Sequence, residues 1–211
     1  MRYVTGFWMG SLCVLAGAAA LLSPLATQVV RAGSEHTSAV TVTGHVLQPD
    51  GKPAPMAAVW LEAPGLHGEP LPHAVLDQRN KTFIPHVLVV TPGTKVEFPN
   101  NDTVFHNVFA EFEAKRFDLG MYPRGAKKVQ QFDRAGVVSL LCNIHPTMSA
   151  FIVIADSPYR ATTDKAGVFR LPDVPAGNYT VHVWHESGGT TKQSCVVGSA
   201  TAPLTLTLNR P

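Results

Sequence analysis

A cysteine, a histidine and a methionine lie close together in the segment CNIHPTM, residues 142–148. They offer a soft thiolate, an imidazole nitrogen and a thioether sulfur, and copper is the ion that accepts all three kinds of donor. The apolar runs GVVSLL and SAFIVIA flank the segment. Such flanks predict a tight loop between two strands, and the residues on that loop indicate a copper site.

A second imidazole is supplied by His106, in the run VFHNVF. Two histidines and a cysteine with a weak axial methionine form the blue-copper arrangement that transfers electrons. A single ion held by four protein ligands has no open position for a substrate, unlike a catalytic metal site. The chain also has no Gly-x-Ser-x-Gly, Cys-x-x-Cys-His or His-x-His sequence. We therefore expect an electron carrier with one Cu(I)/Cu(II) ion rather than an enzyme.

Two other interpretations of Cys142 compete with copper. Zinc accepts a cysteine and two histidines, but methionine is a poor zinc ligand and the loop has no fourth hard donor. A disulfide with Cys195 would be ordinary in an exported protein, and it would exclude the copper site. We expect Cys195 to be a buried thiol in a protein core instead.

The rest of the chain predicts many short strands. Apolar residues make up 45% and charged residues 15%, and 17 prolines and 17 glycines separate short apolar runs. Residues 74–155 contain about eight such runs, which is typical of a Greek-key β-sandwich. The flanking stretches 40–62 and 162–208 have too few strands to cover their own apolar faces. They are predicted to form one small sandwich together, with the middle segment inserted at a surface loop. Three consecutive modules are the alternative.

The first 32 residues predict a targeting segment. Arg2 precedes a long apolar run that ends in Val30-Arg31-Ala32, the pattern of a secretory signal cleaved after residue 32. An uncleaved membrane anchor facing the periplasm is the alternative. The remaining chain has 15 basic and 15 acidic residues and no long basic run, which argues against nucleic acid as a partner.

Two resemblances to known families refine this interpretation. FIPHVLVVTPGTKVEFPNNDTVFHNVF together with CNIHPTM resembles the plastocyanin/azurin cupredoxins, most closely the amicyanins and methylamine-utilisation-type proteins. VTGHVLQPDGKPAPMAAVWLE and TTDKAGVFRLPDVPAGNYTVHVWHE resemble the two halves of a carboxypeptidase regulatory-like, or transthyretin-like, domain. The resemblances imply an all-β chain with a cupredoxin sandwich (69–155) inserted in or flanked by a small transthyretin-like β-sandwich (33–68 and 156–211), after a signal peptide (1–32).

The cupredoxin resemblance also assigns roles to residues. It implies that His106, Cys142 and His145 are the strong copper ligands, that Met148 is the axial ligand, and that the backbone N–H of Asn107 bonds the cysteine sulfur. It implies that the ring edge of His145 reaches the surface as the electron port. The expected function is transfer of single electrons between redox proteins in the periplasm. The alternatives are a copper-holding or copper-delivering protein without a redox partner, and a binding module with structural copper.

Overall fold

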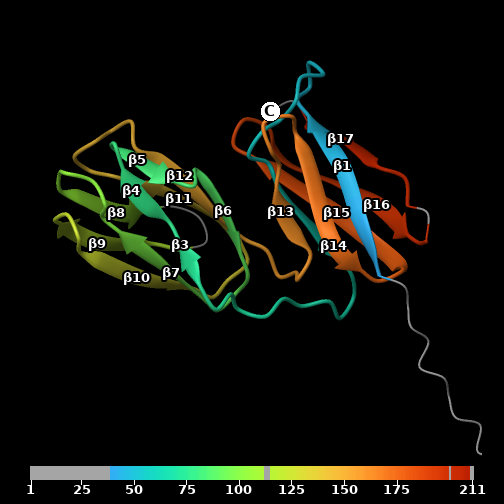
Figure 1. The fold of residues 1–211 in the computed structure, drawn as a ribbon, viewed down its shortest axis with the longest axis horizontal. Coiled ribbons are helices and arrows are strands. Elements are labelled where there is room, and N and C mark those ends of the chain that lie inside the picture. Colours follow the sequence, from blue (N-terminus) through green and yellow to red (C-terminus); the bar gives the residue numbers. More distant parts are fainter. Residues whose placement is uncertain (1–38, 112–114, 200, 210–211) are drawn as a thin grey trace, which may run out of the picture. The chain divides into compact units, whose positions relative to one another are not determined.

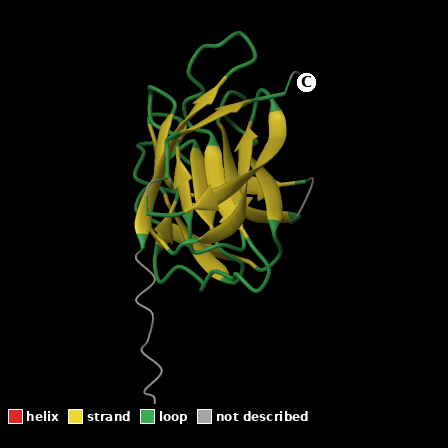
Figure 2. Ribbon diagram, turned by 90° about the vertical axis from the view of Figure 1, so that its right-hand side faces the viewer, coloured by secondary structure: helices red, strands yellow, loops and turns green. Residues whose placement is uncertain are grey.

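A computed structural model describes residues 39–111, 115–199 and 201–209, and every regular element in these ranges is a β-strand (Figures 1 and 2). The predicted all-β class is confirmed. No helix among the described residues is long and apolar enough to span a membrane. The predicted signal peptide, and the anchor that is its alternative, lie outside the described residues.

The first and last parts of the described chain share two sheets. One sheet has the order β14-β1-β17, and the other has the order β13-β2-β15-β16. Within them, Val42 pairs with Leu171 and Val59 with Val183, so segments far apart in sequence lie side by side. The strands are β1 (Val40–Leu47), β2 (Ala58–Glu62), β13 (Arg160–Thr162), β14 (Val168–Val174), β15 (Gly177–His185), β16 (Gly189–Val197) and β17 (Leu204–Thr207).

Alternate apolar residues of these strands face one core, as the two-residue period of a strand requires. In β1, for example, Val42, Gly44 and Val46 are buried. Gly44 has no room for a side chain, since a Cβ there would lie 2.5 Å from the carbonyl oxygen of Leu204 and 2.7 Å from the ring of Phe169. We call this unit the outer sandwich.

The middle of the chain forms a second set of sheets, which we call the inner sandwich. Their orders are β6-β12-β11-β8-β9, β10-β7-β3 and β4-β5. Buried aromatic and aliphatic side chains such as Phe83, Phe98, Phe132 and Leu140 fill the core. The strands are β3 (Ala74–Val75), β4 (Asp77–Arg79), β5 (Thr82–Ile84), β6 (Val87–Val90), β7 (Thr94–Pro99), β8 (His106–Ala110), β9 (Phe117–Tyr122), β10 (Lys127–Phe132), β11 (Gly136–Leu141) and β12 (Ser149–Ile154).

The chain leaves and re-enters the outer sandwich at neighbouring strands. β2 and β13 pair antiparallel, with Trp60 opposite Arg160. One residue further along, the N–H of Leu61 donates to the carbonyl oxygen of Tyr159 at 3.0 Å. The whole stretch between these strands therefore starts and ends at the same place on the outer sandwich.

A small apolar cluster joins the two sandwiches. Ala58 and Trp184 of the outer sandwich are buried against Val87 and Val153 of the inner one. The ring of Trp184 lies 5.0 Å from that of Phe151, between centroids. The contact buries the outward faces of β6 and β12, which explains why these strands are apolar on both faces.

Candidate metal centre

The CNIHPTM segment is the connection between β11 and β12. These strands pair antiparallel up to Leu141 and Ser149, which leaves residues 142–148 as the loop. The N–H of Met148 donates to the carbonyl oxygen of His145 at 2.9 Å and closes a tight turn inside it. His106 is the first residue of β8, which pairs with β11. Strand pairing thus brings together two places that are 36 residues apart.

Three donor atoms converge at this point. Sγ of Cys142 lies 3.9 Å from Nδ1 of His106 and 3.8 Å from Nδ1 of His145, and the two ring nitrogens are 3.1 Å apart. Cys142 and His106 are buried, and His145 is half-buried. Among the described residues, this is the one group of three or more cysteine, histidine and acidic side chains with donor atoms close enough to share an ion.

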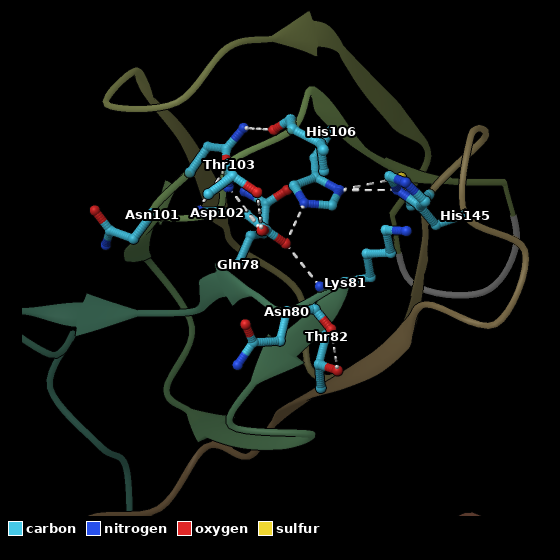
Figure 3. A network of polar contacts seen from close by, with 12 residues as sticks. Gln78, Asn80, Lys81, Thr82, Asn101, Asp102, Thr103, His106 and His145 are labelled. Carbon is cyan, nitrogen blue, oxygen red and sulfur yellow. Dashed lines mark hydrogen bonds and ion pairs between the residues drawn. The ribbon is translucent and has the colours of Figure 1, made fainter.

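The ring of His106 is held from its other side by a carboxylate. Its Nε2 atom lies 2.9 Å from Oδ2 of Asp102 (Figure 3). An ionised carboxylate only accepts hydrogen bonds, so Nε2 must carry the ring proton in the neutral imidazole. The lone pair then lies on Nδ1, which faces Cys142 and His145. Such a carboxylate–histidine contact orients the ring and raises its basicity as a metal ligand.

Asp102 is itself held by the backbone. The same Oδ2 atom accepts the N–H of Lys81 at 2.7 Å, and Oδ1 accepts the N–H of Thr103 at 2.7 Å (Figure 3). The bond from Lys81, followed by those from His106 and Thr103, lowers the pKa of Asp102 from 3.8 to about 2, although burial acts in the opposite direction. The carboxylate is therefore ionised at any pH at which the protein would work.

The surroundings of His145 favour its neutral form. Burial, and then the charges of His106 and Lys81, lower its pKa below the ordinary value of 6.5. A neutral imidazole presents a lone pair and is the form that binds metal ions. The ring is partly open to solvent, whereas the other two donors are enclosed.

Met148 and Asn107 lie beside these donors in different ways. Met148 is buried in the same core cluster as Cys142, and its role as the fourth ligand stays a prediction. The side chain of Asn107 bonds the loop, since its Oδ1 atom accepts the N–H of Asn143 at 2.7 Å. Its Nδ2 donates to Asp118 at 3.2 Å. The predicted bond from the backbone N–H of Asn107 to the sulfur also stays a prediction.

The two described cysteines are separate. Both are free thiols, and Cys195 lies in the core of the outer sandwich, whereas Cys142 lies in that of the inner one. Burial raises the pKa of Cys195, which keeps it protonated. The thiol of Cys142 is therefore available to a metal ion.

Asp102 and Lys81 are the site residues that sequence analysis did not single out. Asp102 stands four residues before His106, a spacing that has no fixed meaning in a loop. Lys81 reaches the site through the β4–β5 turn, where Asn80 and Lys81 both have positive φ, 50° and 56°. The pair Asn80-Lys81 between two short runs could have predicted a two-residue hairpin turn, because asparagine tolerates positive φ.

Parts of this chain are similar to known proteins. Residues 143–209 match the model of the carboxypeptidase regulatory-like domain family. No curated protein matches the chain. Similar solved structures include a purple cupredoxin from Nitrosopumilus maritimus (21% identity, 39% of this chain, 99% of that one, TM-score 0.36). Others are amicyanin from Paracoccus versutus (16%, 46%, 97%, 0.38) and a copper-containing nitrite reductase from Thermus scotoductus (21%, 53%, 28%, 0.39).

Proposed function

We propose that this protein is a type 1 copper protein that carries single electrons between redox partners in the periplasm. One observation carries the proposal: the thiol sulfur of Cys142 and the Nδ1 atoms of His106 and His145 face one point, at mutual separations of 3.1–3.9 Å. Bonds from an ion of about 2.0 Å to nitrogen and about 2.3 Å to sulfur, the lengths found in zinc sites, span such separations.

The donor set fits copper better than zinc. One thiolate and two imidazoles suit both ions, and the buried thioether of Met148 suits copper. When bound, copper supplies a couple that gains and loses one electron with little change in its ligands. The pairing of β8 with β11 and the short β11–β12 loop hold the donors in place, which keeps that change small.

The chain's own residues define how the electron would enter and leave. Cys142, His106 and Met148 are enclosed, so water and substrates have no path to the ion past them. His145 is the ligand that reaches solvent, and its ring edge is the proposed electron port. This arrangement supports outer-sphere electron transfer rather than catalysis on a bound substrate.

An absorption spectrum of the oxidised, copper-loaded protein tests the proposal. We expect an intense band near ~600 nm from thiolate-to-Cu(II) charge transfer. Cys142→Ser should abolish it, and Cys195→Ser, which removes the other described cysteine, should leave it unchanged. The band should disappear and return in a reversible one-electron titration. A colourless oxidised protein would overturn the proposal, and release of Cu(I) to a chelator during cycling would favour copper delivery.

A further inference from the structure

Two large exposed apolar residues stand next in sequence to the paired histidines, whose ring centroids lie 4.7 Å apart. Phe105 immediately precedes His106 and has 55% of its surface exposed, and Ile144 immediately precedes His145 and has 42% exposed. Exposed apolar residues that gather beside a functional site mark a surface for a protein partner.

A lysine stands beside this apolar surface in a demanding backbone conformation. The turn between β4 and β5 places Asn80 and Lys81 at positive φ, where glycine fits most easily and a lysine is disfavoured. The N–H of Lys81 is bound to Asp102, which fixes the turn against the metal centre. A strained non-glycine residue at a functional site points to a role for its side chain.

The ammonium group of Lys81 is directed at the electron port. Figure 3 shows its side chain extending toward His145. The N–H of Lys81 donates to the same carboxylate oxygen that contacts His106, so the turn that carries this lysine lies beside the ligands. Lys81 is exposed and has no ion-pair partner within the described ranges.

Most other charges near this end are paired, and the exposed Asp118, which accepts a hydrogen bond from Nδ2 of Asn107 at 3.2 Å, is the carboxylate that stands against the free cations. Arg79 forms an ion pair with Asp77, and Lys127 forms one with Glu97. The buried carboxylate of Asp102 contacts His106. Arg124 lies in the β9–β10 turn, which the N–H of Gly125 ties to Asn100 at 2.7 Å. Like Lys81, Arg124 is exposed and makes no ion pair with any described residue.

We infer that the surface formed by Phe105, Ile144 and His145 docks a redox protein whose contact face is acidic, and that Lys81 is the cation that recognises it. The inference rests on the proposed function, because it takes His145 as the electron port. The apolar residues provide contact area, and the lysine steers a negatively charged partner toward the ring edge. A rim charge of this kind acts mainly on the association rate and on its salt dependence.

Electron transfer from the reduced, copper-loaded protein tests this. Two oxidants of opposite charge would each take one electron from Cu(I): hexacyanoferrate(III), which becomes hexacyanoferrate(II), and tris(phenanthroline)cobalt(III), which becomes cobalt(II). Stopped-flow absorption would follow the appearance of the blue band. Lys81→Glu is the test variant, and it keeps a non-glycine residue at the positive φ. Lys165→Glu is the matched control, since it changes the same charge on an exposed turn of the outer sandwich.

At low salt, Lys81→Glu should slow the reaction with hexacyanoferrate(III) and speed the reaction with the cobalt complex, each by about tenfold relative to Lys165→Glu. The difference should vanish at 1 M salt, where the Debye length is about 3 Å. An acidic cytochrome c should respond like hexacyanoferrate(III), and a basic one should not.

Equal rates for the two variants, in a protein with a normal blue band, would overturn the inference and leave the proposed function intact. A protein without the band would overturn both. If Lys81→Glu does not fold, Lys81→Gln should show about a threefold effect with the same signs.

Discussion

Oδ2 of Asp102 lies 2.9 Å from Nε2 of His106, on the side of the ring that faces away from Cys142. The same oxygen accepts the N–H of Lys81, so a single carboxylate atom joins the metal centre to the β4–β5 turn. The turn, the carboxylate and the histidine are therefore connected by hydrogen bonds. A change in any one of them should alter the properties of a metal ion bound by His106.

Asp102→Asn should raise the reduction potential while keeping the blue band. The substitution removes a negative charge that favours Cu(II) over Cu(I), and it frees the ring to change tautomer. A tenfold loss of affinity for Cu(II) relative to Cu(I) corresponds to about 59 mV, which we expect as the size of the shift. Cyclic voltammetry measures it. Asp77→Asn, which removes a neighbouring carboxylate that contacts no ligand, should leave the potential within about 10 mV.

Met148→Leu should keep the blue colour and raise the potential by an amount on the order of 100 mV. In the proposed site Met148 is the weak axial ligand, so its loss removes electron density that stabilises Cu(II). Leucine fills nearly the same buried volume. Spectroscopy and voltammetry on the same sample separate the two effects. Complete loss of the band would show instead that Met148 is needed to form the site.

Trp184→Ala should destabilise the protein by about 3 kcal/mol, because it empties the cluster in which Trp184 packs on Phe151. Urea unfolding monitored by circular dichroism gives the change in the free energy of unfolding. Val196→Ala removes a side chain that is 73% exposed, and it should cost less than about 0.5 kcal/mol. Similar losses for both variants would contradict a packed contact between the sandwiches.

Gly44→Ala should destabilise the outer sandwich by about 2–3 kcal/mol, because the new methyl group would collide with the backbone of Leu204 and the ring of Phe169. Gly198→Ala is the matched control, since a Cβ at that position meets no atom within 4 Å. Thermal unfolding of both variants checks the difference. A stable Gly44→Ala protein would mean that β1 and β17 can move apart.

Stability should fall below neutral pH in part through His182. Burial lowers the pKa of His182 below the ordinary value of 6.5, although its contact with Glu62 acts against this. Since the unfolded chain then takes up the proton first, the stabilising contribution is full above about pH 6.5 and is lost as the pH falls through the folded-state pKa. Unfolding free energies at pH 7.5 and 5.5 should differ less in His182→Gln than in the wild type. Equal slopes would indicate that other groups cause the loss.

Much of this fold could be predicted because it depends on local patterns. The alternating runs around residues 42–47 and 179–184 predict strands with one buried face, and the loop between GVVSLL and SAFIVIA follows from two apolar strands separated by seven residues. The convergence of His106 with the loop was predicted only from the resemblance to cupredoxins. The pairing of β8 with β11 joins Phe109 to Leu141, which are 32 residues apart, and no local pattern indicates such a pairing.

Other features depend on contacts that no sequence period encodes. The bonds from Asp102 to His106 and Lys81 require a loop and a hairpin to meet, and neither has a regular spacing. The sequences of β6 and β12 are those of ordinary buried strands. They do not indicate that Trp184 of the outer sandwich packs against them, and only the structure shows this contact. The bond from the side chain of Asn107 to the N–H of Asn143 is a further contact of this kind, and it was not predicted from the sequence.

The antiparallel pairing of β2 with β13 has a consequence for engineering. Residues 61 and 159 are bonded neighbours, so deleting what lies between them would leave two chain ends about 4.8 Å apart, the spacing of adjacent strands. A two-residue turn bridges that gap. We therefore expect that the inner sandwich can be removed by closing one hairpin, and that it can be inserted into an exposed hairpin of an unrelated host protein.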